Sequence, residues 1–147
     1  MDLKSTLQSD LKDALRKGEE TRKSTIRMAL TAIKLAEVSK IGLLDESESM
    51  AIIQKEIKSR KETITDAEKA NRPDLIPPAE EEIKILQTYL PTALAPEELD
   101  NMAKVAVAES GATSIREMGQ VMKILIPRLQ GRATGDQASA AVRKLLQ

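Results

Sequence analysis

The stretch SIREMGQVMKILIPRLQGRATG, residues 114–135, decides the fold, because it combines a helix start, a helical apolar period and a helix end. Ser114 and Glu117 have the spacing of a capping box, which satisfies free backbone donors at a helix start. Gly131 and Gly135 can take the left-handed backbone that a helix end requires. Between them, apolar residues recur with helical periodicity: Ile115, Met118, Val121, Met122, Leu125, Ile126 and Leu129. The stretch predicts an amphipathic helix with a basic outer edge.

Pro127 lies inside this apolar pattern. A proline costs up to about 3 kcal/mol inside a regular helix, so we expect the element to bend or divide there. Such a break would direct Arg128 and Arg132 toward the start of the last helix, away from the axis that carries Arg116 and Lys123. The turn after Pro127 is therefore the first place to expect a bound phosphate.

The turn GRATG, residues 131–135, has the look of a glycine-rich phosphate loop because it precedes a helix N-terminus. However, no strand leads into it, and no Lys-Ser or Lys-Thr pair follows its second glycine. It is therefore either a helix connection or a turn that contacts an anion.

The composition favours helices in the rest of the chain as well. Of the 147 residues, 41% are hydrophobic and 31% are charged, which is typical of a globular protein. Phe and Trp are absent and Tyr89 is the only aromatic residue, so a core must be built from Leu, Ile, Val, Met and Ala. These residues together suit helices better than sheets. The sequence predicts an all-α protein of one domain or two small subdomains.

The chain contains neither Cys nor His. This excludes disulfides, Cys/His zinc sites, thiol nucleophiles and triads with an imidazole base. No nucleotide-binding or nucleophile-elbow motif occurs, so we predict no catalytic residues, no metal site and no cofactor. The chain has no apolar run near the ~20 residues that cross a membrane, and its first residues lack the apolar core of a signal peptide. We therefore expect a cytoplasmic protein without membrane association.

Two helices open the chain. Leu residues recur at every fourth position before Gly18, which predicts a first helix of about four turns. The second helix, residues 20–39, carries one apolar strip that includes Ile26 and a smaller one formed by Met28 and Leu35, so we expect burial on two sides. Three cations line up between the strips: Lys23, Arg27 and Lys34. They either extend over a packed helix into solvent or contact phosphate.

The next two helices are predicted to fold back on each other. Asp45 and Glu48 form a second capping-box pattern before a helix that continues to about Ala70. Residues 71–78, NRPDLIPP, must form a loop whose last prolines open the following helix. Arg60 interrupts the apolar seam of the longer helix, and we expect it to extend into solvent or to pair with an acid on the next helix. The nearest such acids are Glu80, Glu81 and Glu82.

The chain is predicted to divide near residues 92–96. The N-terminal helical subdomain covers residues 1–92 and consists of helical hairpins. The C-terminal subdomain covers residues 95–147 and is a small three-helix bundle. Asp136 is the expected N-cap of its last helix, and Leu145 is expected to point inward.

The C-terminal third is locally basic. The whole chain has 23 basic and 23 acidic residues, but residues 113–147 have six basic against two acidic. Such an excess favours an anionic partner. Without aromatic residues for stacking, any RNA contact would be to the backbone and shape of a folded RNA. The predicted contacts are Arg116, Lys123, Arg128, Arg132, Arg143 and Lys144, with Lys23, Arg27 and Lys34 as a possible second strip.

Two groups of residues resemble a known family. The C-terminal part resembles the signature of the GatB/YqeY tail domain. The residues that carry this resemblance are Met118-Gly119-x-Val121-Met122, Pro127 and Gly131-Arg132-Ala133-x-Gly135. The part upstream resembles free-standing YqeY proteins. The residues that carry this second resemblance are Arg22 with Thr25-Ile26-Arg27, Lys55-Glu56-Ile57-Lys58 with Arg60, and Tyr89-Leu90-Pro91. The resemblance covers nearly the whole chain. It has two departures, which are Thr134, where members commonly have Asp, and the Pro77-Pro78 pair, in a region that is often continuous helix.

This resemblance implies an all-helical protein whose C-terminal bundle contacts tRNA. In GatB, a subunit of the glutamine-dependent tRNA amidotransferase, the related bundle contacts the outer corner of tRNA, and similar domains extend some glutaminyl-tRNA synthetases. The family is linked by similarity to this carbon–nitrogen ligase, but the kinase and glutaminase chemistry lies in domains not found in these residues. The resemblance thus implies a non-catalytic tRNA-binding or tRNA-charging accessory protein.

Two other functions remain open. The chain could be a protein–protein interaction module whose cationic helices meet an acidic surface, such as an aminoacyl-tRNA synthetase or an amidotransferase subunit. An enzyme that uses Lys, Asp or Tyr is the third and weakest hypothesis.

Overall fold

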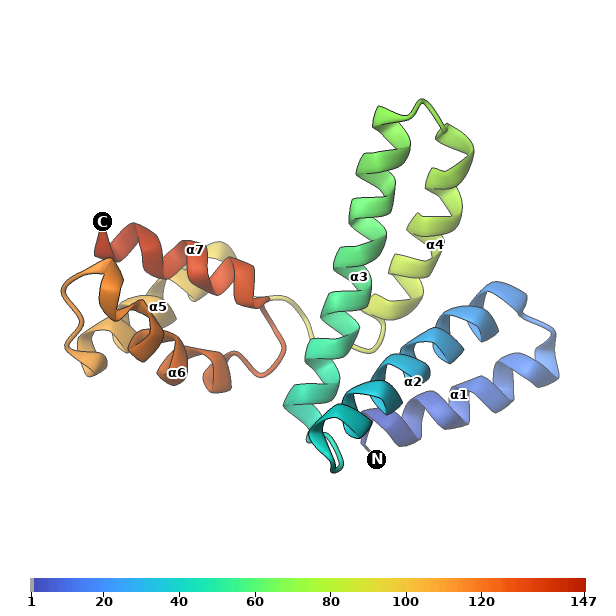
Figure 1. Cartoon of the computed structure of the whole chain (residues 1–147), viewed down its shortest axis with the longest axis horizontal. Helices are drawn as coiled ribbons and strands as arrows, with labels where there is room; N and C mark the ends of the chain where they lie inside the picture. The colour runs from blue at the N-terminus through green and yellow to red at the C-terminus, as the bar shows by residue number, and fades with distance from the viewer. Residues whose placement is uncertain (1) are drawn as a thin grey trace. The chain divides into compact units, whose positions relative to one another are not determined.

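The computed structural model describes residues 2–147 and contains seven α-helices and two short 3₁₀ helices, with no strand in that range (Figure 1). The predicted all-α class is confirmed. The helices form two compact units, one that ends at Leu90 and one that covers Pro91–Gln147. Each unit has its own hydrophobic core.

The first unit consists of two helical hairpins. α1 (Leu3–Lys17) folds back on α2 (Glu20–Lys40), and α3 (Glu46–Lys69) folds back on α4 (Ile76–Gln87), with the 3₁₀ helix η1 (Pro73–Leu75) in the second connection (Figure 1). Aliphatic side chains from all four helices fill the core, and the largest fully buried ones are Leu7, Ile26, Ile33, Ile53 and Leu86. The predicted hairpins are confirmed.

The helix ends of the first unit follow the signals in the sequence. Gly18 ends α1 in the left-handed conformation, with φ at 69°. The Asp45 carboxylate accepts a hydrogen bond from the Glu48 amide at 2.8 Å, and the Glu48 carboxylate accepts one from the Asp45 amide at 3.2 Å, so the predicted capping box forms. Pro77 and Pro78 lie in the first turn of α4, where a backbone donor has no intrahelical acceptor.

α2 is buried on one side only, which corrects the prediction of burial on two sides. Ile26 and Ile33 are fully buried, whereas Met28 and Leu35 are 50% and 63% exposed. The reason is that α1, α3 and α4 all contribute to the one core that covers the Ile26 side of α2. A four-helix unit has no further helix to cover the Met28 side.

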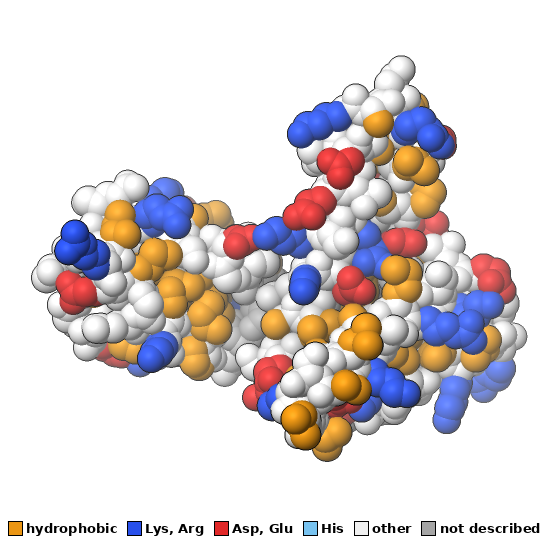
Figure 2. All heavy atoms as spheres, in the orientation of Figure 1, with side chains coloured by type: hydrophobic (Ala, Val, Ile, Leu, Met, Phe, Trp, Pro, Cys, Tyr) orange, Lys and Arg blue, Asp and Glu red, His pale blue; other side chains and the backbone are white. Residues whose placement is uncertain are grey.

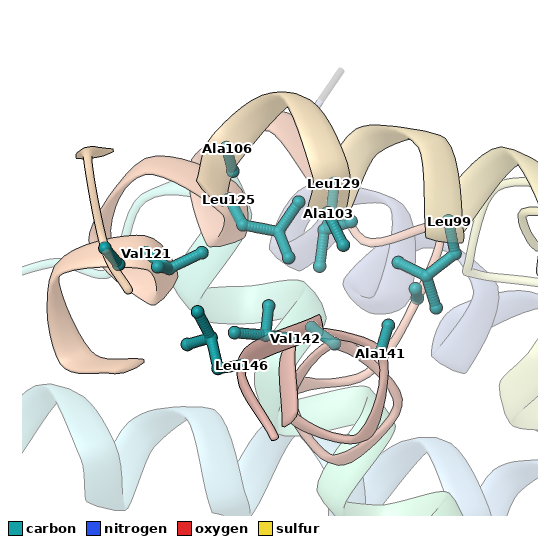
Figure 3. Packing of buried hydrophobic residues seen from close by; sticks show 12 residues of the cluster. Leu99, Ala103, Ala106, Val121, Leu125, Leu129, Ala141, Val142 and Leu146 are labelled. Atoms are coloured by element: carbon teal, nitrogen blue, oxygen red, sulfur yellow. The ribbon is translucent and has the colours of Figure 1, made fainter. Parts of the chain in front are cut away.

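The second unit is the predicted three-helix bundle. It contains α5 (Pro96–Ser110), the 3₁₀ helix η2 (Ile115–Glu117), α6 (Met118–Leu129) and α7 (Gly135–Leu146). Each of the three α-helices packs against the other two. Figure 3 shows side chains from all three meeting in the core, among them Leu99, Ala103, Val121, Leu125 and Val142. The many alanines in this core allow the helix backbones to approach closely.

The helix starts of the second unit differ from the prediction. Ser114 makes no capping hydrogen bond, because the 3₁₀ turn η2 precedes α6 and the Glu117 carboxylate instead accepts from the Thr113 amide at 3.2 Å. The last helix is capped by Thr134 and not by Asp136. The Thr134 hydroxyl accepts from the Gln137 amide at 3.1 Å, and the Gln137 side chain accepts from the Thr134 amide at 2.9 Å.

The turn before α7 determines at which residue the helix starts. Gln130 and Gly131 are the left-handed residues, with φ at 50° and 77°, whereas Gly135 is the first residue of α7. α7 starts two residues earlier than an N-cap at Asp136 predicts. At its other end Leu146 is buried and Leu145 is 37% exposed, so the prediction that Leu145 points inward is wrong. Thr134, one of the two departures from the resembled motif, caps the helix.

Pro127 does not divide α6, so of the two predicted outcomes, a bend or a division, the division is wrong. The helix continues through Pro127 to Leu129. Pro127 is the third residue from the end of the helix. Its missing amide donor removes one intrahelical hydrogen bond at a place where only two more residues of the helix follow. The change of direction comes afterwards, at Gln130 and Gly131.

Candidate nucleic-acid interface

Four of the predicted contact residues are exposed cations without an ion-pair partner among residues 2–147. They are Arg116 in η2, Lys123 in α6, and Arg143 and Lys144 in the last turn of α7. Lys123 lies two residues from each of the buried Val121 and Leu125, which places it on the outer side of α6. These four side chains can therefore reach a phosphate without giving up a carboxylate.

Arg128 is already engaged within the second unit. Its guanidinium donates to the Glu109 carboxylate at 2.5 Å, which joins the end of α6 to the end of α5. The hydrogen bond raises the pKa of Arg128 and lowers the pKa of Glu109. Both side chains remain about half exposed, so a phosphate would have to compete with this carboxylate.

Arg132 is engaged as well, in an arrangement that the sequence did not indicate. Its Nε donates to the Thr92 carbonyl at 2.9 Å, and its own carbonyl accepts from the Leu94 amide at 2.9 Å. One Nη lies 3.9 Å from the Glu98 carboxylate. Arg132 thus fastens the segment before α5 to the turn before α7. The two ends of this contact lie 40 residues apart, so no local pattern could reveal it.

The turn 130–134 uses its polar groups internally. The Arg132 amide donates to the Leu129 carbonyl at 2.9 Å, and the Thr134 amide donates to the Gln137 side chain. Gly131 and Ala133 also have interactions within the protein. This geometry favours the helix connection over the anion-contacting turn.

The second predicted strip of cations lies on α2. Lys23 forms an ion pair with Glu20 at 2.8 Å, and this hydrogen bond lowers the pKa of Glu20. Arg27 and Lys34 are exposed and have no ion pair among the described residues. Both lie along one edge of the α2 face that carries the exposed Met28 and Leu35.

Arg60 is paired, as one of the two predicted outcomes stated. The residue is 6% exposed, and its Nε donates to the Glu82 carboxylate of α4 at 2.7 Å. One Nη donates to the Glu56 carbonyl at 3.0 Å and lies 3.6 Å from the Glu56 carboxylate. A cation is tolerated at this seam position because two carboxylates neutralise it.

A second polar cluster joins α1, α2 and the end of α4. The Tyr89 hydroxyl donates to the Asp10 carboxylate at 2.6 Å, and the Arg22 guanidinium donates to the Asp13 carboxylate at 2.9 Å. Burial, and then the hydrogen bond to Asp10, raise the pKa of Tyr89. The bond from Arg22, followed by those from Lys17 and Arg16, lowers the pKa of Asp13 to about 2. The motif residues Arg22 and Tyr89 therefore hold the first unit together.

Other kinds of site were sought over the same residues. Within residues 2–147 no three Asp or Glu side chains gather closely enough to hold a metal ion. No helix in this part of the chain has the length and apolar character to cross a membrane. In the view of Figure 2, the Lys and Arg side chains of the second unit form separate groups with hydrophobic side chains exposed between them.

The fold and the surface define a class: helical proteins that combine an N-terminal part of two hairpins with a small C-terminal bundle bearing surface cations. The positions of the motif residues narrow this class to one family. The chain belongs to the YqeY family, whose model, described as Yqey-like protein, matches residues 4–146.

Similar proteins are found in fungi. The chain is 39% identical over 97 residues to "Altered inheritance of mitochondria protein 41, mitochondrial" of Vanderwaltozyma polyspora, covering 64% of this chain and 52% of the relative. A protein of the same name from Pyrenophora tritici-repentis is 31% identical over 134 residues, covering 89% and 73%. One from Kluyveromyces lactis is 40% identical over 100 residues, covering 65% and 54%. The chain spans about half the length of the two yeast relatives.

These names overturn one prediction. We expected a cytoplasmic protein, but the similar proteins are named as mitochondrial. The prediction was wrong because it rested on the lack of an apolar signal peptide in the first residues. That feature says nothing about import into an organelle.

Proposed function

We propose that this protein is a non-catalytic accessory protein that binds folded RNA, with tRNA or a tRNA-charging assembly as its target. The observation that carries the proposal is the set of four exposed, unpaired cations on the second unit. The resemblance of the same unit to the tail domain of GatB supports tRNA as the RNA.

The ion pairs rank the predicted contacts. Binding of a phosphate by Arg116 or Lys123 releases condensed counterions from the RNA and breaks no bond in the protein. Arg128 must give up its ion pair with Glu109 to bind a phosphate, and Arg132 must keep its hydrogen bond to the Thr92 carbonyl. Both residues therefore contribute less to the RNA affinity. On α2, Lys23, Arg27 and Lys34 border exposed apolar side chains, which suits a protein surface better than a phosphate backbone.

The proposed recognition is of shape and backbone. Tyr89 is the only aromatic residue, and its hydroxyl is bound to Asp10 within the first unit. Stacking platforms for unpaired bases are built from aromatic side chains or Arg planes. A folded RNA with a fixed arrangement of phosphates is the ligand that four separate cations suit.

A filter-binding titration of the full chain with bulk tRNA tests the proposal. If about four phosphates are contacted, the affinity should fall with salt with a log–log slope near −3 to −4. Replacing Arg116, Lys123, Arg143 and Lys144 together by Ala should abolish most of this slope. The charge-matched control replaces four exposed lysines elsewhere, and its members are Lys12, Lys61, Lys69 and Lys84.

Three results would contradict RNA binding by this surface. One is the absence of binding at low salt, and another is an equal loss of affinity in the two quadruple variants. The third is tRNA binding with a slope near zero, which would show that phosphates are not the contacts. Circular dichroism of both variants verifies that the helices are intact.

A further inference from the structure

The outer face of α2 carries an apolar seam that stays largely exposed in the first unit, although the Met28 sulfur accepts a hydrogen bond from the Arg60 guanidinium of α3 at 3.5 Å. Met28, Leu35 and Val38 are exposed large hydrophobic residues, and Thr31 lies between them on the same face. Their spacing of three, four and three residues is the spacing by which one helix packs along another. The opposite face of α2, with Ile26, is buried in the core. α2 therefore has two packing faces, and the unit fills one of them.

The seam continues into the turn after α2, where the backbone is strained. Ile41 caps the helix in the left-handed conformation, with φ at 59°, and it is 94% exposed. This conformation costs roughly 1–2 kcal/mol for a residue with a Cβ, and a β-branched residue is especially unusual there. The neighbouring Leu43 is exposed as well. The backbone is satisfied there, because the Ile41 and Gly42 amides donate to the Val38 and Glu37 carbonyls at 3.2 and 3.1 Å, but the Ile41 side chain itself is left in solvent.

The part of the seam from Met28 to Leu35 lies in an open groove of about 670 Å³. Its floor includes Met28, Ala32 and Leu35 of α2, and Glu56 of α3 lines it as well. In Figure 2, exposed hydrophobic side chains gather around the connection from α2 to α3. The groove is therefore concave and mixed in character, because charged side chains lie beside its apolar residues. Its two carboxylates are already paired, Glu20 with Lys23 and Glu56 with Arg60, so Arg27 is the charged lining residue without an ion pair among the described residues. Such a surface suits an amphipathic rod better than a purely apolar ligand.

Charge identifies the occupant. Arg27 and Lys34 lie seven residues apart along one edge of the seam, and neither has an ion pair among the described residues. A second copy of α2 packed antiparallel would bring like charges together along that edge. An anionic membrane surface would meet the acidic turn beyond the seam, where Asp45, Glu46 and Glu48 outnumber Lys40. A partner helix with Asp or Glu beside its apolar stripe meets both conditions.

We propose that this seam binds one amphipathic helix of a partner protein. The apolar stripe of that helix packs on Met28, Leu35 and Val38, and its flanking carboxylates face Arg27 and Lys34. Ile41 and Leu43 extend the contact at the end of the groove. This binding is separate from the RNA contacts, which belong to the second unit.

Photo-crosslinking with the full chain tests the proposal. A photoreactive amino acid is placed at position 35 in cells, and the crosslinked peptide is mapped by mass spectrometry; position 12, on the exposed side of α1, is the control. We expect a peptide with apolar residues three and four apart and acidic residues beside them. No crosslink above the control, or a crosslink to RNA, to lipid or to a second copy of this chain, would overturn the proposal.

The mapped segment, made as a synthetic peptide, is then titrated against variants. Replacing Met28 and Leu35 together by Ala should weaken binding about tenfold or more. The matched control is Leu15→Ala, which removes a similarly exposed apolar side chain from α1. R27E/K34E should also weaken binding, and a peptide with Lys in place of its acids should regain it. Equal affinity of the wild type and the Met28/Leu35 variant would overturn the proposal, whereas the second-unit quadruple variant should bind the peptide normally.

Discussion

The two units differ in how deeply their cations are engaged: the first buries a paired cation, Arg60, whereas the six cations of residues 113–147 in the second all stay at least partly exposed. Within residues 2–147, only Arg128 and Arg132 of those six meet a carboxylate. In the first unit, Arg22 and Arg60 point inward or along helix contacts and bind carboxylates. In the second unit, Arg116 and Lys123 face solvent with no ion-pair partner among the described residues. The difference teaches that a basic residue in a family motif is not by itself a sign of an anionic ligand. What distinguishes a structural cation from a binding one is whether the fold supplies a carboxylate.

The units also differ in how their cores are built. Leu and Ile dominate the core of the first unit, whereas the second contains six alanines: Ala103, Ala106, Ala112, Ala133, Ala138 and Ala141. Small residues bury little apolar area each, so the few large ones contribute a greater share of the stability. The second unit should therefore be the more sensitive to loss of a single leucine.

Deleting one large core side chain in each unit has the largest expected effect. Leu125→Ala and Ile53→Ala each leave a cavity at a fully buried position and should cost about 2–5 kcal/mol. Hydrogen exchange measured peptide by peptide should show lost protection in the second unit for the Leu125 variant and in the first unit for the Ile53 variant. Loss of protection throughout the chain in both variants would show that the units unfold as one.

Removing the buried cation of the first unit should have the next largest effect. Arg60→Ala leaves the Glu82 carboxylate without its partner, and because both acids are partly exposed we expect a cost of about 2–3 kcal/mol. Urea denaturation measures it, with Lys61→Ala on the neighbouring exposed position as control. Combining Arg60→Met with Glu82→Leu should recover much of the loss. If the Arg60→Ala variant is as stable as the Lys61→Ala control, the ion pair between Arg60 and Glu82 does not stabilise the hairpin.

The hydroxyl of the single aromatic residue should contribute less. Tyr89→Phe keeps the ring and removes the hydrogen bond to Asp10, for an expected cost of about 1–2 kcal/mol. The same urea titration measures it. If the bond is the cause, Tyr89→Phe made in an Asp10→Asn background should cost less than in the wild type, and an undiminished cost would point to packing instead.

Two of the three left-handed residues that are not glycine end helices, one in each unit, and they allow a smaller comparison. Ile41 in the first unit and Gln130 in the second both cap helices with positive φ. Replacing either by Gly removes the strain, and we expect Ile41→Gly to stabilise by about 0.5–1 kcal/mol and Gln130→Gly by less, because a β-branched residue is strained more. Thermal denaturation measures both. A destabilised Ile41→Gly variant would show that the isoleucine packs in the free protein.

Acid should remove the smallest contribution. The pKa of Asp13 is about 2, below its ordinary value of 3.8, because Arg22, Lys17 and Arg16 bind the charged form. A carboxyl group with a lowered pKa stabilises the fold above its unfolded pKa, and this stabilisation is lost as the pH falls through the folded value. The gap in melting temperature between the wild type and Asp13→Asn should therefore be constant above about pH 5 and close between pH 4 and pH 2. A gap that persists at pH 2 would contradict the assignment.

The sequence predicted what depends on neighbours along the chain. The hairpins, the stop at Gly18 and the capping box at Asp45 follow from spacings of a few residues. For Arg60 the sequence left two outcomes, extension into solvent or pairing with an acid on the next helix, and the structure shows the second. The burial of α2 on one side only could not be predicted, since it depends on how many helices surround α2.

The candidate site was harder to predict for the same reason. The six cations near the C-terminus look alike in the sequence, yet Arg128 meets Glu109 and Arg132 meets Thr92, 19 and 40 residues away. Which of the cations remain available depends on how α5 and α6 are packed. The cap at Thr134 was missed because Asp136 is an equally good capping residue. Where the last helix starts depends on the turn before it, in which Gln130 and Gly131 take the left-handed conformation.

The contact between Arg132 and Thr92 bears on how this unit could be joined to other proteins. Because residues 92–94 are bonded to the turn before α7, the connecting segment belongs to the bundle that follows it. A gene fusion made at Pro91 would transfer the bundle together with its own attachment, whereas one made at Ala95 would discard two hydrogen bonds. The bundle therefore carries its own N-terminal connection, already bonded to the turn before its last helix.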